Sequence, residues 1–71
     1  MEWRYDLKLN KTQNDIMEYL TVALADGAKY ISYGNIGKKV GRSRHSVGYS
    51  IEILVKRGYL IITADRKLDI A

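Results

Sequence analysis

The chain has 71 residues, enough for one small domain with a single modest core. It contains no cysteine, which excludes a disulfide framework and a cysteine-based metal site, and no apolar run approaches the roughly 20 residues of a membrane span. The net charge of +4 is unevenly spread, since residues 1–31 carry −1 and residues 32–71 carry +5. A basic half indicates a footprint for a polyanion such as nucleic acid, although mild basicity for solubility alone gives the same pattern.

The first ten residues carry a strict alternation of apolar and charged side chains. The apolar positions are Trp3, Tyr5, Leu7 and Leu9. A period of two is typical of a strand with one buried face, so the sequence predicts a strand over residues 2–9. This N-terminal strand or arm, residues 1–10, either packs on its own domain or joins two subunits as a dimerisation arm.

A helix is predicted next. Asn10 or Thr12 can cap its N-terminus, and Thr12 with Asp15 three residues later approximates a capping box. Apolar residues then recur at the spacing of one helical face, at Ile16, Leu20, Ala23 and Leu24. Gly27 suits the end of this helix, and residues 29–31 are long enough only for a short strand.

Serine and glycine residues mark the ends of two further predicted helices. Ser32 can cap the first of these, and Gly41 ends it. Ser43 can cap the next, and Gly58 ends it. The apolar side chains on their buried faces are Ile36 and Val40 in the first, and Val47, Ile51 and Leu54 in the second.

Two β-rich runs close the chain. Residues 59–63 and residues 67–70 have strand composition, and residues 64–66 can form a turn. The sequence therefore predicts a short hairpin over residues 59–70.

The segment from Ile36 to Gly58 reads IGKKVGRSRHSVGYSIEILVKRG. Its spacing of apolar, glycine and serine positions resembles the winged helix-turn-helix family, which includes MarR-, GntR- and LexA-type DNA-binding domains. The resemblance covers roughly residues 12 to 70, with the helix-turn-helix at residues 32–57. It implies an α+β fold with a three-helix core and a short β-hairpin wing, to which this chain adds an extra N-terminal strand.

The resemblance also implies that the third helix meets duplex DNA. We expect the face opposite its apolar stripe to enter the major groove, because contacts concentrate at the N-terminal end of such a helix. The residues predicted to contact bases are Arg44, His45, Ser46 and Tyr49. The residues predicted to contact phosphates or the backbone are Ser43, Arg42, Lys38, Lys39, Lys56, Arg66 and Lys67.

Three residues fit this interpretation less simply. Gly48 weakens a helix by about 1 kcal/mol relative to Ala, so either DNA approaches closely there or the helix tolerates the loss. Glu52 puts a negative charge on the expected DNA side, unless it accepts from a cytosine amine. Ile53 stands where the family has a polar residue, and it either packs under the N-terminal strand or faces a second subunit.

The sequence therefore predicts one domain over residues 1–71 that acts as a small, sequence-specific transcriptional regulator. A homodimer is expected, because a single head covers only one half-site. No catalytic residue, metal, cofactor, small-molecule ligand or membrane partner is expected, and the expected location is the cytoplasm, on the nucleoid in a prokaryote. If the chain is part of a longer protein, the same head could serve in replication or transposition.

Other interpretations remain open. The same fold could bind protein through Tyr49, Glu52 and Ile53. The tetrapeptide at residues 34–37 matches the GxxG core of an RNA-binding KH domain, although the helix-turn-helix spacing explains many more residues. An enzyme is disfavoured, because His45 is the only histidine and no phosphate-binding loop has the required spacing.

Overall fold

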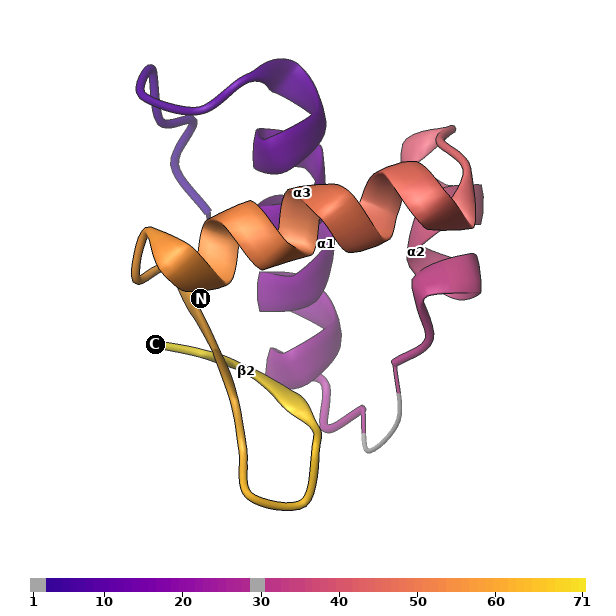
Figure 1. Ribbon diagram of the computed structural model, residues 1–71, viewed down its shortest axis with the longest axis vertical. Helices are drawn as coiled ribbons and strands as arrows, with labels where there is room; N and C mark the ends of the chain where they lie inside the picture. The colour runs from indigo at the N-terminus through magenta and orange to yellow at the C-terminus, as the bar shows by residue number, and fades with distance from the viewer. Residues whose placement is uncertain (1–2, 29–30) are drawn as a thin grey trace.

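The computed structural model describes residues 3–28 and 31–71, which form three α-helices and one antiparallel β-hairpin. The elements in chain order are α1 (Lys11–Ala25), α2 (Tyr33–Val40), α3 (Arg44–Lys56), β1 (Leu60–Ile62) and β2 (Leu68–Ile70). In Figure 1, α3 crosses in front of α1, α2 lies beside the N-terminal end of α3, and the hairpin projects to the bottom of the view. This small α+β domain is compatible with a winged-helix layout.

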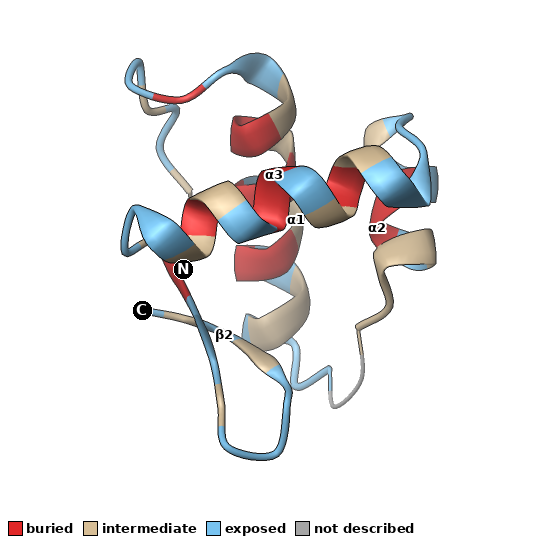
Figure 2. Ribbon diagram, in the orientation of Figure 1, coloured by how far each residue is buried: buried red, intermediate tan, exposed pale blue. Residues whose placement is uncertain are grey.

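The core lies where the three helices meet β1. Its buried apolar side chains among the described residues are Leu9, Ile16, Met17, Leu20, Ile36, Val47, Ile51, Leu54 and Leu60. Figure 2 shows the buried positions along α1 and α3 and on the side of α2 nearest to them. Full burial of a Leu or Ile side chain contributes about 1.5–3 kcal/mol relative to exposure, so these contacts hold α3 against the core by one face.

The N-terminus of α1 is capped by Asn10, not by Thr12. The Asn10 side chain accepts a hydrogen bond from the backbone N–H of Gln13 at 2.8 Å, and the Gln13 side chain accepts from the backbone N–H of Asn10 at 3.0 Å. The predicted box of Thr12 with Asp15 is therefore wrong, because both of these residues lie inside the helix. The reciprocal pair satisfies two of the four N–H groups that a helix start leaves unpaired.

The predicted ends of α2 and α3 are confirmed. Ser32 caps α2 and Ser43 caps α3, each through its side-chain oxygen. Gly41 ends α2 with a φ of 71°, a left-handed conformation that a residue with a side chain rarely adopts.

Gly37 permits the tight turn between α2 and α3. The backbone N–H of Arg42 donates to the Gly37 carbonyl at 3.0 Å. A Cβ atom added at Gly37 would lie 2.5 Å from the carbonyl oxygen of Arg42, closer than atoms can approach. The glycine in the middle of α2 is therefore required by the turn that follows it, and the GxxG tetrapeptide lies inside a helix, not in a loop.

The predicted N-terminal strand is wrong for the part of it that the structure describes. Residues 3–9 contain no strand, and Glu2 lies outside the described residues. Tyr5 is 62% exposed and Leu7 is 91% exposed, so two of the four alternating apolar side chains face solvent. The side chains that turn inward are Trp3, Asp6 and Leu9. These inward positions are three residues apart, so burial does not alternate from residue to residue as it does in a strand.

The buried side chain of Asn14 holds these inward-facing residues in place. It lies in α1 and is 2% exposed. Its Oδ1 accepts from the indole Nε1 of Trp3 at 3.0 Å and from the backbone N–H of Asp6 at 2.8 Å. Its Nδ2 donates to the backbone carbonyls of Asp6, Leu9 and Asn10. The buried amide is thus fully hydrogen-bonded, and it fixes the backbone of the N-terminal segment (residues 3–9) to α1.

The end of α3 holds the other side of the N-terminal segment. The Tyr59 hydroxyl donates to Oδ2 of Asp6 at 2.6 Å, and Nη1 of Arg57 donates to the Lys8 carbonyl at 3.1 Å. The rings of Trp3 and Tyr59 meet edge to face, with centroids 6.1 Å apart. The segment therefore packs on its own domain, and Tyr5 and Leu7 remain exposed on it.

The hairpin is confirmed, with shorter strands than predicted. Leu60 pairs with Ile70 and Ile62 pairs with Leu68, which leaves a connection of five residues. Arg66 has a φ of 63° in this connection, a turn conformation that is uncommon for a residue with a side chain. Of the short strand predicted at residues 29–31, the first two residues lie outside the described structure, and Ile31 is not in a strand.

Candidate nucleic-acid interface

Helix α3 separates its side chains into a buried face and an exposed face. Its buried apolar residues, each at most 1% exposed, are Val47, Ile51 and Leu54. Its exposed residues on the other side are Arg44, His45, Tyr49, Glu52 and Lys56. This division follows from the helical period of 3.6 residues, so the predicted faces of α3 are confirmed.

The two serines at the start of α3 are less available than the charged residues beside them. The Ser43 Oγ accepts a hydrogen bond from the backbone N–H of Ser46 at 3.1 Å, which is the helix cap. Ser46 is itself half-buried. The hydroxyl of Ser43 is exposed and keeps its own O–H as a donor.

Three exposed cations surround the turn that leads from α2 to α3. Lys38 and Lys39 lie in the last turn of α2, where the helix dipole also favours positive charge, and Arg42 lies in the turn itself. The charge of Arg42 reaches Lys11 at the start of α1. The pKa of Lys11 is raised by its hydrogen bond to Asp15 and by the charge of that carboxylate, and the positive charge of Arg42 opposes this effect. Because Lys11 is paired with Asp15 at 2.8 Å, it adds little net positive charge to this surface.

Lys56 lies at the opposite end of α3 from Arg44, about 18 Å away along the helix axis. Its Nζ lies 3.6 Å from Oε1 of Glu52, one turn earlier. The pair is exposed, so it adds little stability, but it compensates the negative charge that Glu52 brings to this face. Ile53 is half-buried, and the N-terminal residues under which it was expected to pack do not form a strand.

Arg66 and Lys67 are exposed at the tip of the hairpin. The Lys67 Nζ lies 3.8 Å from a carboxylate oxygen of Asp65. The Thr63 hydroxyl donates to the same Asp65 side chain, and this hydrogen bond is the largest cause of a lowered pKa of Asp65. One acidic side chain therefore accompanies the two cations that the sequence places at the tip.

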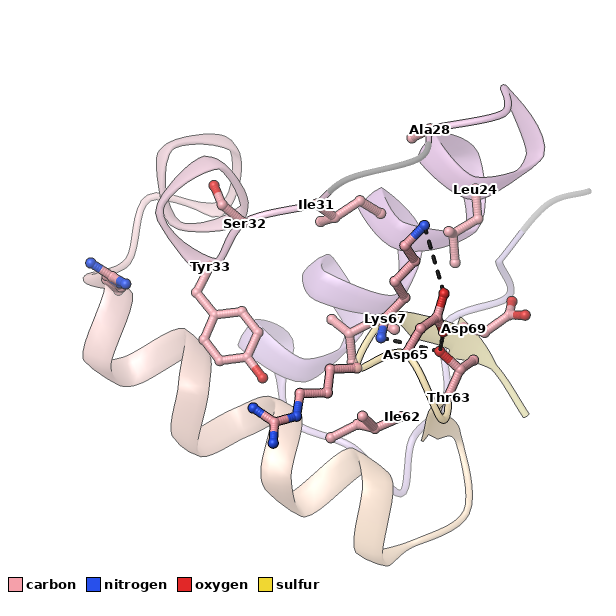
Figure 3. Close-up of a pocket in the computed structure, with 13 residues that line it drawn as sticks. Leu24, Ala28, Ile31, Ser32, Tyr33, Ile62, Thr63, Asp65, Lys67 and Asp69 are labelled. Carbon is pink, nitrogen blue, oxygen red and sulfur yellow. Dashed lines mark hydrogen bonds and ion pairs between the residues drawn. The ribbon is translucent and has the colours of Figure 1, made fainter.

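The tip of the hairpin and the start of α3 border one cleft of about 660 Å³. This hairpin cleft is lined by Leu24, Ala28, Ile31, Ser32, Tyr33, Arg44, Ile62, Thr63, Asp65, Arg66, Lys67, Leu68 and Asp69. Figure 3 shows Tyr33 reaching toward the cleft from the helical side, with Thr63 and Asp65 on the hairpin side. The structure thus brings predicted residues from two separate elements to one opening.

A second hollow, of about 550 Å³, lies on the exposed face of α3. This α3 hollow is lined by Tyr33, Arg44, His45, Gly48, Tyr49 and Glu52. Sequence reasoning gave no role to Tyr33, whose ring carbon Cδ2 lies 3.4 Å from where a Cβ of Gly48 would be. Neither explanation offered for Gly48 included this contact. A glycine inside a helix was the one signal that could have suggested a neighbouring ring.

No group of three His, Cys, Asp or Glu side chains in residues 3–28 and 31–71 is placed to hold a metal ion. Over the same residues, no helix combines the length and the apolar composition that crossing a membrane requires. Comparison with models of protein families, with curated proteins and with solved structures finds no match to this chain.

Proposed function

We propose that this chain is a winged helix-turn-helix domain that binds duplex DNA, and that it acts as a small, sequence-specific transcriptional regulator in the cytoplasm. The observation that carries the proposal is the exposed N-terminal half of α3. Arg44, His45 and Tyr49 face solvent there, while the other side of the same helix is anchored in the core. A rigid helix held by one face is what insertion into a major groove requires.

The surrounding charges support the same proposal. Exposed cations precede α3 at Lys38, Lys39 and Arg42, and others lie across the hairpin cleft at Arg66 and Lys67. In our proposal these side chains bind phosphates, with Ser43 donating its O–H and Lys56 contributing weakly from the far end of α3. Arg44, His45 and Tyr49 contact base edges, and the half-buried Ser46 contributes least to that set.

Loss of two cations tests this interface. The variant Arg42→Ala/Arg44→Ala removes two charges at the start of α3, and Arg4→Ala/Lys8→Ala removes two exposed charges from the N-terminal segment. The second pair is a matched control, because Lys8 lies at the Arg57 end of α3. We expect the first variant to bind a labelled random-sequence duplex at least tenfold more weakly at low salt, in fluorescence anisotropy, while the control stays close to wild type. Equal weakening of both variants would show that net charge alone attracts DNA.

A protein-binding role is the second candidate. The exposure of Leu7 and Tyr5 favours it, because apolar side chains gathered on an exposed segment are typical of a surface that contacts another protein. A module of this kind would give no salt-dependent affinity for duplex DNA, so the same titration separates the two functions.

A further inference from the structure

The exposed face of α3 carries a ridge with a gap in it. Arg44, Gly48 and Glu52 are spaced by four residues, so they follow one another along a single row on the helix surface. Arg44 and Glu52 project from this row, and Gly48 between them has no side chain. The gap therefore lies between a cation and a carboxylate.

Two aromatic residues flank the gap. The ring of Tyr33, from the start of α2, has its Cδ2 and Cε2 atoms 3.4 Å and 3.5 Å from the Cβ position of Gly48. Tyr49 follows Gly48 directly and is 67% exposed. Both tyrosines line the α3 hollow, whose exposed surface is mostly apolar. An open apolar surface between two charged side chains is suited to a small apolar group that projects between polar ones.

We propose that the gap at Gly48 receives the C5-methyl group of a thymine. This inference rests on the proposed function and names what the site selects. The thymine methyl is the apolar group that base pairs of unmodified DNA present in the major groove, beside the acceptors of guanine and the amines of cytosine and adenine. Arg44 then pairs with a guanine edge at one end of the ridge, and Glu52 accepts from an amine at the other.

The length of the ridge agrees with this assignment. Arg44 and Glu52 are eight residues apart, or about 12 Å along the helix axis. Successive base pairs are about 3.4 Å apart, and a helix that lies in the major groove is inclined to the duplex axis, so the two ends of the ridge span at most about three to four base steps. A thymine between them lies opposite Gly48, and the pair of Glu52 with Lys56 lowers the repulsion between its carboxylate and the phosphates.

Replacement of thymine by deoxyuridine tests the inference, because it removes the methyl group and changes no hydrogen bond. A duplex is first selected by the wild-type protein from a randomised pool, and each of its thymines is then replaced singly. We expect one position at which the loss of the methyl group weakens binding about fourfold, as the burial of one such group implies. The measurement is fluorescence anisotropy on the wild-type protein.

Two variants locate the effect. Gly48→Ala fills the gap with a methyl group of its own, and Tyr49→Ala removes one wall; in both, the selected duplex and its deoxyuridine form should bind equally. Val22→Ala shortens an exposed apolar side chain of α1, away from the α3 hollow, and should keep the fourfold difference. Circular dichroism establishes that each variant is folded.

Each outcome decides a different point. Equal binding of every deoxyuridine duplex by the wild-type protein overturns the inference and leaves DNA binding intact. A thymine preference that persists unchanged in Gly48→Ala and Tyr49→Ala also overturns it, because the methyl group would then be recognised elsewhere. Failure to bind any duplex at low salt overturns the proposed function and, with it, the inference.

Discussion

Asn14 is the side chain on which the N-terminal segment depends most. Replacement by Ala leaves the Trp3 indole N–H, the Asp6 N–H and the Leu9 carbonyl without this hydrogen-bond partner, whereas the carbonyls of Asp6 and Asn10 keep backbone N–H donors. Since an unpaired buried polar group costs about 1–3 kcal/mol, we expect Asn14→Ala to lower the free energy of unfolding by about 3 kcal/mol in a urea titration. Asn35→Ala, at an exposed position of α2, is the control and should change it by less than about 0.5 kcal/mol. Similar values for the two variants would refute the role given to Asn14.

Gly37 and Gly34 form a natural pair for testing the α2–α3 turn. A Cβ at Gly37 would clash with the Arg42 carbonyl at 2.5 Å, whereas a Cβ at Gly34 would find its nearest atom, Oγ of Ser32, at 3.9 Å. We expect Gly37→Ala to destabilise the fold by at least about 2 kcal/mol. Gly34→Ala should instead be neutral or stabilise by up to about 1 kcal/mol, because Ala favours a helix. Thermal unfolding of both variants decides the matter, and a stable Gly37→Ala would mean that the turn has room to move.

At the scale of elements, the N-terminal segment should respond to acid through Asp6. The hydrogen bond from Tyr59, followed by that from the Lys8 backbone N–H, lowers the pKa of Asp6 from its ordinary 3.8. A carboxyl whose pKa is lower in the folded state adds stability that is present above pH 3.8 and is lost as the pH falls through the folded-state value. Tyr59→Phe removes the main cause, so its stability should fall less than that of wild type when urea titrations above and below pH 3.8 are compared. An identical acid dependence would contradict the assignment.

The elements differ in how far the sequence could predict them. Helices α2 and α3 were predicted closely, because Ser32, Gly41 and Ser43 define their ends through local conformation. The N-terminal strand was predicted wrongly, because an alternating pattern indicates a strand only where a neighbouring strand pairs with it. What determines the course of these residues is a buried amide in α1, and Asn14 looked in the sequence like any polar helical residue.

The candidate site was predictable to the same extent and for the same reason. The exposed face of α3 follows from its period, which placed Arg44, His45 and Tyr49 correctly at the surface. The position of Tyr33 against Gly48 depends on how α2 crosses α3, and the proximity of Lys11 to Arg42 depends on where α1 lies. Contacts between elements leave no periodic signal in the sequence.

At the scale of the whole molecule, we predict that the protein is a homodimer, since two heads are needed to read two half-sites. Leu7 and Tyr5 offer an exposed apolar surface at the N-terminal segment for this contact. Light scattering should give twice the mass of the 8.1 kDa chain at high concentration, and Leu7→Asp should return it to a monomer. Val22→Glu, at an exposed apolar position of α1, is the control and should leave the mass unchanged. A monomeric wild-type mass, with and without DNA, would end this prediction.

The decisive measurement is the salt dependence of duplex binding. With about six phosphate contacts, the logarithm of the association constant should fall against the logarithm of salt concentration with a slope of about −5. The slope should become less steep by about 1 in Arg42→Ala/Arg44→Ala, because only Arg42 of this pair is assigned to a phosphate, and it should remain unchanged in Arg4→Ala/Lys8→Ala. That result would establish DNA binding through the start of α3. Negligible binding at low salt, or a slope that both double variants change equally, would refute DNA binding through the start of α3.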